Sequence, residues 1–114
     1  MLYSEGVRAG RISLGRFGEV LATNPAQLFG LYPRKGTIAV GGDADIVVFD
    51  PELTRVITAA MLKSNPDYAV YEGWVVTGWP SITIRRGEIV FRDDTVIGLP
   101  GSGELIRRGP TAQL

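Results

Sequence analysis

Hydrophobic residues in the first third of the chain recur every three to four positions, which is the spacing of a helix. Leu14, Phe17, Val20 and Leu21 stand at i, i+3, i+6 and i+7, so a helix would carry all of them on one face. Ser13 comes directly before them and is a favoured residue at a helix N-cap. The pattern therefore predicts a helix that begins after Ser13 and buries this face.

Two other helical segments are expected beside that one. Residues 1–10 look like the last turn or two of a helix that began earlier, because they carry no start signal, and this is a hint of a larger protein. Asn24 is an N-cap residue, and a proline and a capping-box glutamine follow it. Gly30 and Pro33 would stop the helix that starts there. We expect a separate short helix over residues 25–31.

Beyond residue 36 the pattern changes to that of strands. The run from Ile46 to Phe49, closed by Asp50-Pro51, is apolar, β-branched and too short for a helix. Turn residues separate the later runs at hairpin spacing, so we expect an antiparallel sheet. The expected strands are 37–40, 45–49, 54–57, 74–77, 81–86, 88–92 and 95–97, with a turn at Gly41-Gly42, one helical turn after Thr58 and a connection over 63–67. The fold class is α+β, with two or three helices followed by antiparallel strands.

The later strands indicate that one face of the sheet is apolar. Ile82 and Ile84 alternate with Thr83 and Arg85, and residues 88–92 repeat this alternation. The other face should be at least partly exposed to water.

Composition and charge narrow the possible functions. A chain of 114 residues with 45% hydrophobic and 21% charged residues fits one modest globular domain. Twelve basic residues balance twelve acidic ones, so neither nucleic acid nor an anionic membrane is favoured as a partner. The N-terminus lacks the basic flank and apolar core of a signal peptide, and we expect a cytoplasmic location.

Histidine and cysteine are both missing from the sequence. Without them the chain cannot build a usual zinc site, a Ser-His-Asp or Cys-His catalytic group, or an imidazole general base. The residues themselves therefore offer no catalytic, cofactor-binding or metal-binding candidate of these kinds.

Asp43, Asp45, Asp50 and Glu52 form the densest group of carboxylates, and calcium accepts oxygen ligands of this type. An EF-hand loop would need a third ligand where Val47 stands, with a glycine just after it. The interpretation that we favour is turn chemistry at the two ends of a strand, with the side chains bonding their own backbone.

Three other features allow more than one interpretation. The glycine-rich stretch GLPGSGELIRRG could cradle a phosphate, but it has no P-loop lysine; we interpret residues 98–114 as an extended tail that Leu105 and Ile106 anchor. Trp74 and Trp79 could stack on bases or sugars, although packing at a sheet edge is the favoured interpretation. The basic pairs, favoured as solvated surface or interface residues, are Arg34-Lys35, Arg85-Arg86 and Arg107-Arg108.

The segment GTIAVGGDADIVVFDP, residues 36–51, resembles the segment by which chains of the metal-dependent amidohydrolase superfamily leave their TIM barrel for a small β-sandwich. SEGVRAGRISLGRF, TNPAQLFGLYPRKG, SNPDYAVYEGWVVTGWP, RRGEIVFRD and GLPGSGELIRR are similar to the hydantoinase and dihydropyrimidinase branch. The resemblance implies that residues 1–35 are the last barrel helices, residues 36–97 the C-terminal part of the β-sandwich, and residues 98–114 an extended C-terminal tail.

The same resemblance implies a cyclic amide hydrolase that opens hydantoin or dihydropyrimidine rings. In that branch two divalent metals, usually zinc, are held by residues upstream of this segment, so catalytic, cofactor-binding and metal residues here are expected to be none. The alternative is a non-catalytic dihydropyrimidinase-like assembly or scaffold module. Expected partners are the remainder of the amidohydrolase chain or other subunits. Incomplete sheet edges also favour a homo-oligomer.

Overall fold

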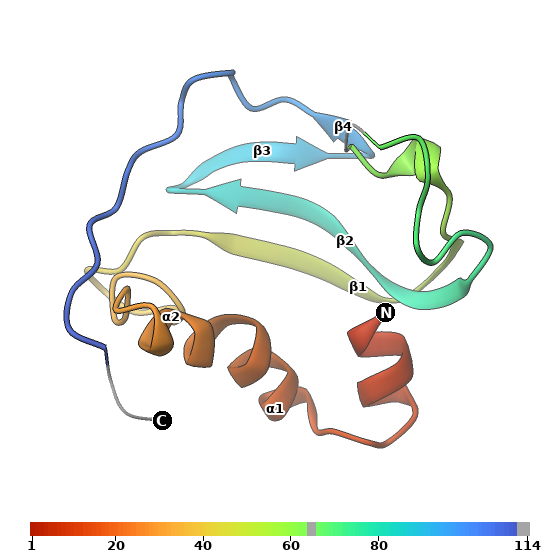
Figure 1. Cartoon of the computed structure of the whole chain (residues 1–114), viewed down its shortest axis with the longest axis horizontal. Helices are drawn as coiled ribbons and strands as arrows, with labels where there is room; N and C mark the ends of the chain where they lie inside the picture. The colour runs from red at the N-terminus through yellow and green to blue at the C-terminus, as the bar shows by residue number, and fades with distance from the viewer. Residues whose placement is uncertain (64–65, 112–114) are drawn as a thin grey trace.

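The computed structural model describes residues 1–63 and 66–111, with helical segments first and strands after them (Figure 1). The predicted connection over residues 63–67 and the last residues of the tail lie partly outside this description. The helical segments are η1 (Leu2–Arg8), α1 (Leu14–Gly18), η2 (Glu19–Thr23) and α2 (Asn24–Leu28), of which η1 and η2 are π-helical. The sheet contains β1 (Ile46–Val56), β2 (Val75–Arg85), β3 (Glu88–Arg92) and β4 (Thr95–Val96), with the 3₁₀ turn η3 (Ala59–Met61) between β1 and β2.

One continuous helix, made of α1, η2 and α2, replaces the two helices that the sequence predicts. Its start is as predicted, because Ser13 Oγ accepts a hydrogen bond of 3.1 Å from the backbone N–H of Arg16. The prediction that a separate helix starts at Asn24 is wrong, because the backbone of Asn24 is already helical, with a φ of −63° and a ψ of −45°. The wider π-helical turn just before Pro25 reduces the clash between a proline ring and the carbonyl four residues earlier. Gly30 ends the helix with a φ of 65°, as predicted.

The strand predicted at residues 37–40 is wrong, because these residues form an irregular loop in which Ile38 is 82% exposed. Gly36 directs the chain along the helix: with a φ of 83°, it approaches so closely that a Cβ there would stand 2.4 Å from the Cβ of Ala26. The predicted turn at Gly41-Gly42 is present, and the N–H of Gly42 donates to the carbonyl of Ala39 at 3.1 Å.

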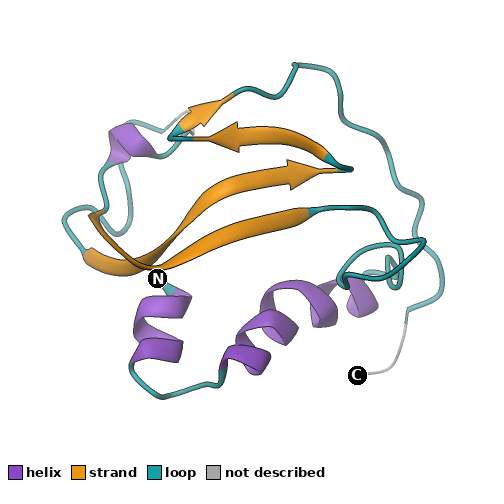
Figure 2. Cartoon of the chain, turned by 180° about the vertical axis from the view of Figure 1, so that it is seen from behind, coloured by secondary structure: helices purple, strands orange, loops and turns teal. Residues whose placement is uncertain are grey.

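The sheet is antiparallel with the strand order β1-β2-β3-β4, and the helices lie beside it next to β1 (Figures 1 and 2). The predicted strand at 88–92 is confirmed as β3. β1 joins the strands predicted at 45–49 and 54–57, and β2 joins those predicted at 74–77 and 81–86. The helical turn expected after Thr58 is confirmed as η3.

A bulge carries β1 through the proline at which it was predicted to stop. Asp50 pairs with Trp79 and Thr54 pairs with Thr77, so β1 advances by four residues where β2 advances by two. Pro51 has no N–H group to donate to a hydrogen bond between strands, and in the bulge this position needs no partner on β2. Asp50 Oδ1 accepts hydrogen bonds from the next two backbone N–H groups beyond the proline, at 2.9 and 3.1 Å.

Three aromatic rings join the helices to the sheet. The ring centroid of Tyr3 lies 5.8 Å from that of Phe17 and 4.8 Å from that of Phe49, and both contacts are edge-on. Gly78 of β2 lies directly beneath them with a φ of 96°. A Cβ there would stand 2.3 Å from Tyr3 Cδ1 and 2.7 Å from Phe49 Cζ. Glycine is therefore required both by the backbone and by the rings.

Only part of the predicted apolar faces is buried within this chain. On the helix, Leu14 is 65% and Leu21 is 56% exposed, so these 114 residues by themselves do not bury the whole of the face that the pattern predicts to be buried. Phe17 is the member of that face that packs in the aromatic cluster. On the sheet, Ile82 and Thr83 point to opposite faces yet are both half-buried. The core is centred on Val76, which is fully buried in β2.

Candidate functional site

The four carboxylates that the sequence groups together lie in two separate places. Asp50 and Glu52 belong to the bulge, where Asp50 bonds its own backbone as predicted and Glu52 forms an exposed ion pair of 3.3 Å with Arg8. Asp43 and Asp45 lie in the loop before β1 and bind the side chain of Lys35, which lies earlier in the same loop. For these two, the interpretation that they bond their own backbone is wrong.

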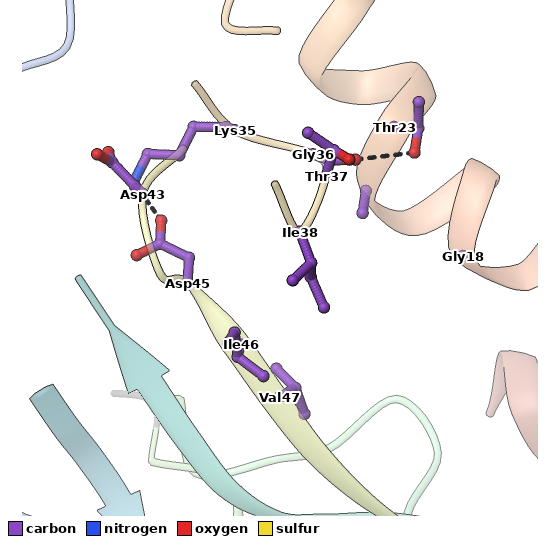
Figure 3. A pocket seen from close by; sticks show the side chains of 11 residues that line it. Gly18, Thr23, Lys35, Gly36, Thr37, Ile38, Asp43, Asp45, Ile46 and Val47 are labelled. Carbon is purple, nitrogen blue, oxygen red and sulfur yellow. Dashed lines mark hydrogen bonds and ion pairs between the residues drawn. The ribbon is translucent and has the colours of Figure 1, made fainter. Parts of the chain in front are cut away.

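A closed ring of polar contacts surrounds the start of β1. Lys35 Nζ binds Asp43 Oδ2 at 2.8 Å and also binds Asp45. Figure 3 shows the lysine side chain reaching both aspartates across the loop. We call this cluster the ionic ring, and its members are Arg34, Lys35, Asp43, Asp45, Arg86 and Glu104.

Three elements supply the ring. Arg34 Nε binds Asp43 Oδ2 at 2.9 Å, within the loop that follows the helix. The backbone N–H of Arg86, in the turn between β2 and β3, donates to Asp45 Oδ1 at 2.8 Å. Glu104 of the tail closes the ring at 3.9 Å from Arg34 Nη2 and 3.7 Å from Arg86 Nη2. The ring thus connects the loop after the helix, the sheet and the tail.

Electrostatic coupling within the ring stabilises the charged forms. Asp43 accepts a hydrogen bond from Lys35, and this bond lowers the pKa of Asp43. Burial alone would raise the pKa of Asp45, but hydrogen bonds from Lys35 and from the N–H of Arg86 outweigh it, so that pKa is also lowered. Burial would lower the pKa of Lys35, and its bonds to both aspartates outweigh this and raise it. All three groups are charged at neutral pH.

A depression of about 360 Å³ lies between the helix, the loop and the first residues of β1 (Figure 3). Ile38, Ile46 and Val47 form its apolar wall. Lys35, Asp43 and Asp45 of the ionic ring also line it. Thr23 Oγ1 also lines it and donates to the carbonyl of Gly36 at 2.8 Å. The Thr23 hydroxyl and the charged groups that line the depression are therefore already paired with other residues of the chain. The depression is a junction between the helix, the loop and β1.

The arrangement of acidic side chains does not fit a metal centre. Within residues 1–63 and 66–111, no group of three or more histidine, cysteine, aspartate or glutamate residues could hold a metal ion. The carboxylates of Asp43 and Asp45 both bind the ammonium group of Lys35. The described residues therefore do not match the ligand set of a two-metal hydrolase.

The remaining sequence candidates serve packing and bridging. Trp79 lies beneath the Arg55 guanidinium, 5.5 Å from carbon to ring centroid, and Trp74 meets Tyr71 edge-on at 5.6 Å. Of the basic pairs, Arg85 Nη2 donates to Ser102 Oγ at 2.7 Å and Arg108 donates to the carbonyl of Phe29. The ionic ring includes Arg34, Lys35 and Arg86. Gly98, Gly101 and Gly103 belong to the extended tail, which no helix follows within the described residues.

Four members of the ring have no sequence signal that points to it. Arg34, Lys35 and Arg86 stand in basic pairs, for which surface or interface positions are the favoured interpretation, and Glu104 lies in the extended tail. Their partners are distant in sequence, so no local pattern indicates the cluster. The nearest signal is the pair of aspartates itself, since two carboxylates beside a strand need a cation close by.

No helix in the described part of the chain combines the length and the apolar character that crossing a membrane requires.

Comparison with known proteins identifies the family. The description "Amidohydrolase family" belongs to the family model that matches residues 2–90. The chain belongs to the amidohydrolase family. It is 50% identical over 108 residues to the D-hydantoinase of Geobacillus stearothermophilus and 44% identical over 110 residues to the D-phenylhydantoinase of Escherichia coli. These alignments cover 95% and 96% of this chain, but 23% and 24% of the relatives, so the amidohydrolase chain spans about a quarter of their length.

Solved structures agree with this similarity. A dihydropyrimidinase from Brevibacillus agri superimposes with a TM-score of 0.95 at 44% identity, covering 99% of this chain and 24% of the other. A D-hydantoinase from a Bacillus species gives a TM-score of 0.94 at 49% identity, covering 98% and 25%. The helix, loop, sheet and tail described above are thus arranged as in these proteins.

Proposed function

We propose that this chain is the C-terminal structural part of a cyclic amide hydrolase of the D-hydantoinase or dihydropyrimidinase type, which opens hydantoin or dihydropyrimidine rings. One observation carries the proposal: the chain matches a D-hydantoinase over 95% of its own length at 50% identity, but covers 23% of that protein. The remaining three quarters would supply the catalytic residues. Location in the cytoplasm stays a prediction from the sequence.

The proposed metal site lies upstream of this segment and holds two divalent ions, with zinc as the expected metal. The absence of histidine and cysteine from the sequence supports this placement, because these residues are the usual nitrogen and sulfur ligands of zinc. The ionic ring has no place in the proposed chemistry, since Arg34 and Lys35 neutralise Asp43 and Asp45, and the guanidinium groups of Arg34 and Arg86 neutralise Glu104.

In the proposed whole protein, residues 1–35 are the last helices of a TIM barrel, residues 36–97 belong to a β-sandwich and residues 98–114 form its tail. Large apolar side chains are exposed in this chain, which supports the proposal that a partner covers them in the whole protein. That partner would be the remainder of the chain or another subunit of a homo-oligomer. On the helices these side chains include Leu14, Leu21, Leu28 and Phe29, each at least half exposed.

The test is the activity of the complete natural protein. We expect metal-dependent opening of 5-substituted hydantoins or dihydrouracil, lost on chelation and restored by zinc. Complete protein that folds, binds no metal and leaves both ring types intact would instead support the non-catalytic assembly module.

The 114-residue chain alone provides a second test. We expect it to self-associate in sedimentation experiments, because its apolar helix face and its sheet edges have no covering partner. Addition of the separately expressed upstream part should convert these species into a defined complex. A monodisperse, well-folded monomer would contradict the proposed docking role.

A further inference from the structure

The segment after β4 returns across the molecule to the helices, where Figure 1 shows it passing the end of the sheet before it reaches α2. Its first attachment is at Ser102. Arg85 Nη2 donates to the hydroxyl of Ser102 at 2.7 Å, and Arg86 Nη2 donates to its carbonyl at 2.9 Å. This attachment joins the tail to the end of β2 and the turn that follows.

The second attachment is Glu104, which closes the ionic ring between Arg34 and Arg86. Its carboxylate is 58% exposed, and the two arginines are about half and about a quarter exposed. Neighbouring Leu105 is 94% exposed, so the prediction that it anchors the tail is wrong, whereas Ile106 is half-buried. The middle of the tail is therefore held mainly by charge.

The third attachment is at the C-terminal end of the helix. Arg108 Nε donates to the carbonyl of Phe29 at 2.9 Å, and its guanidinium lies 5.7 Å from the centroid of the Phe29 ring. The N–H of Gly109 donates to the carbonyl of Gly30 at 2.8 Å. Helix ends leave carbonyl groups unpaired and carry a partial negative charge, so a cation and an N–H group are suitable partners there.

We propose that residues 99–109 form a strap, a conformational latch that fastens the end of the helix to the turn between β2 and β3. When it is closed, the strap completes the ionic ring and restrains the loop over residues 31–45. Because its attachments are polar and either part-buried or exposed, with no apolar core of their own, it opens locally without unfolding the sheet. This latch goes beyond the proposed enzymatic function and does not depend on it.

Gly30 gives the sharpest test, because a Cβ there would stand 2.2 Å from the carbonyl oxygen of Gly109. Gly30→Ala should therefore displace the strap. Gly10→Ala is the matched control: Gly10 has a similar φ of 71°, against 65°, but no atom lies within 4 Å of the added Cβ. Both variants strain the backbone to a similar degree, and only Gly30→Ala presses on the strap.

The measurement is limited trypsin digestion of the complete natural protein, with cleavage after Arg107 and Arg108 quantified by mass spectrometry. Cleavage follows the population of the open strap, so we expect Gly30→Ala to be cut roughly ten-fold faster than Gly10→Ala. Hydrogen exchange over residues 31–45 should rise in the same variant. Equal cleavage and equal exchange in the two variants would overturn the proposal.

A milder variant covers the case in which Gly30→Ala misfolds. Glu104→Gln removes the ring closure on an exposed side chain. Glu19→Gln is its control, because Glu19 is similarly exposed and pairs with Arg16 at 3.0 Å, and neither residue contacts the strap. We expect a few-fold faster cleavage after Arg107 for Glu104→Gln and wild-type cleavage for Glu19→Gln. If neither variant changes the cleavage rate, Glu104 does not hold the strap closed and the latch is overturned.

Discussion

The helical segments meet the sheet at two junctions of opposite character. At one, the rings of Tyr3, Phe17 and Phe49 pack against Gly78 with no room for one more carbon atom. At the other, the ionic ring joins loop, turn and strap through charged groups that solvent reaches. The first junction should be sensitive to volume and insensitive to pH, and the second the reverse.

The largest expected effect is at the aromatic junction. Gly78→Ala forces a Cβ into the Tyr3 and Phe49 rings and strains a backbone with a φ of 96°, so it should lower the free energy of unfolding by about 3 kcal/mol. Gly73→Ala is the control, with a φ of 81° and no atom near the added Cβ, and should cost about 1 kcal/mol. Urea denaturation measures both. Equal losses would mean that the rings do not press on Gly78.

Neutralising the centre of the ionic ring should have the next largest effect. Lys35→Met leaves Asp43 and Asp45 facing each other without their shared cation, and we expect Tm to fall by several degrees. Arg16→Met breaks the exposed pair between Arg16 and Glu19, and should change Tm by about 1 °C or less. Thermal scans of the two variants side by side distinguish a structural ring from ordinary surface charge.

The pH dependence sharpens the same comparison. Because the pKa values of Asp43 and Asp45 are lower in the folded protein than in the unfolded chain, they contribute stability above about pH 4, and this is lost as the pH falls through the folded values. The pKa of Lys35 is raised, so its contribution is lost only as the pH rises beyond about 10.5. Denaturation at a series of pH values should show a steeper acid loss for wild type than for Lys35→Met. Parallel curves would contradict the coupling.

Salt should give the smallest effect. Raising the NaCl concentration to about 1 M shortens the screening length to about 3 Å and weakens the exposed part of the ring. The difference in Tm between wild type and Lys35→Met should then shrink, while the difference between wild type and Gly78→Ala should not. A salt-dependent Gly78→Ala effect would show that the two junctions are not independent.

Local signals were the part of the fold that the sequence could predict. Ser13 caps its helix and Gly30 ends its helix, because both roles depend on neighbouring residues. Residues 88–92 form a strand as their alternation indicates. The prediction of a strand at residues 37–40 failed because the β-branched residues there are typical of a strand. The close contact of Gly36 with the helix, which the sequence pattern does not show, determines the course of this loop.

Long-range contacts could not be predicted in the same way. Pro51 looks like the end of a strand until the opposing β2 residues are known, and only then is a bulge visible. Gly78 has no neighbouring residue that indicates its role, which is to leave room for the aromatic rings of Tyr3 and Phe49. The ring has no sequence signature, since Lys35 and Glu104 meet only through tertiary structure. The family resemblance was visible from the sequence because it rests on motifs along nearly the whole chain.

Metal content of the purified 114-residue chain tests the central claim most directly. After incubation with excess zinc and gel filtration, elemental analysis and a hydantoin-hydrolysis assay are made on the same sample, with the complete natural protein in parallel. We predict no retained zinc and no hydrolysis by the 114-residue chain, and both by the complete protein. Stoichiometric zinc with metal-dependent turnover in the 114-residue chain would contradict the proposal that the catalytic site lies upstream.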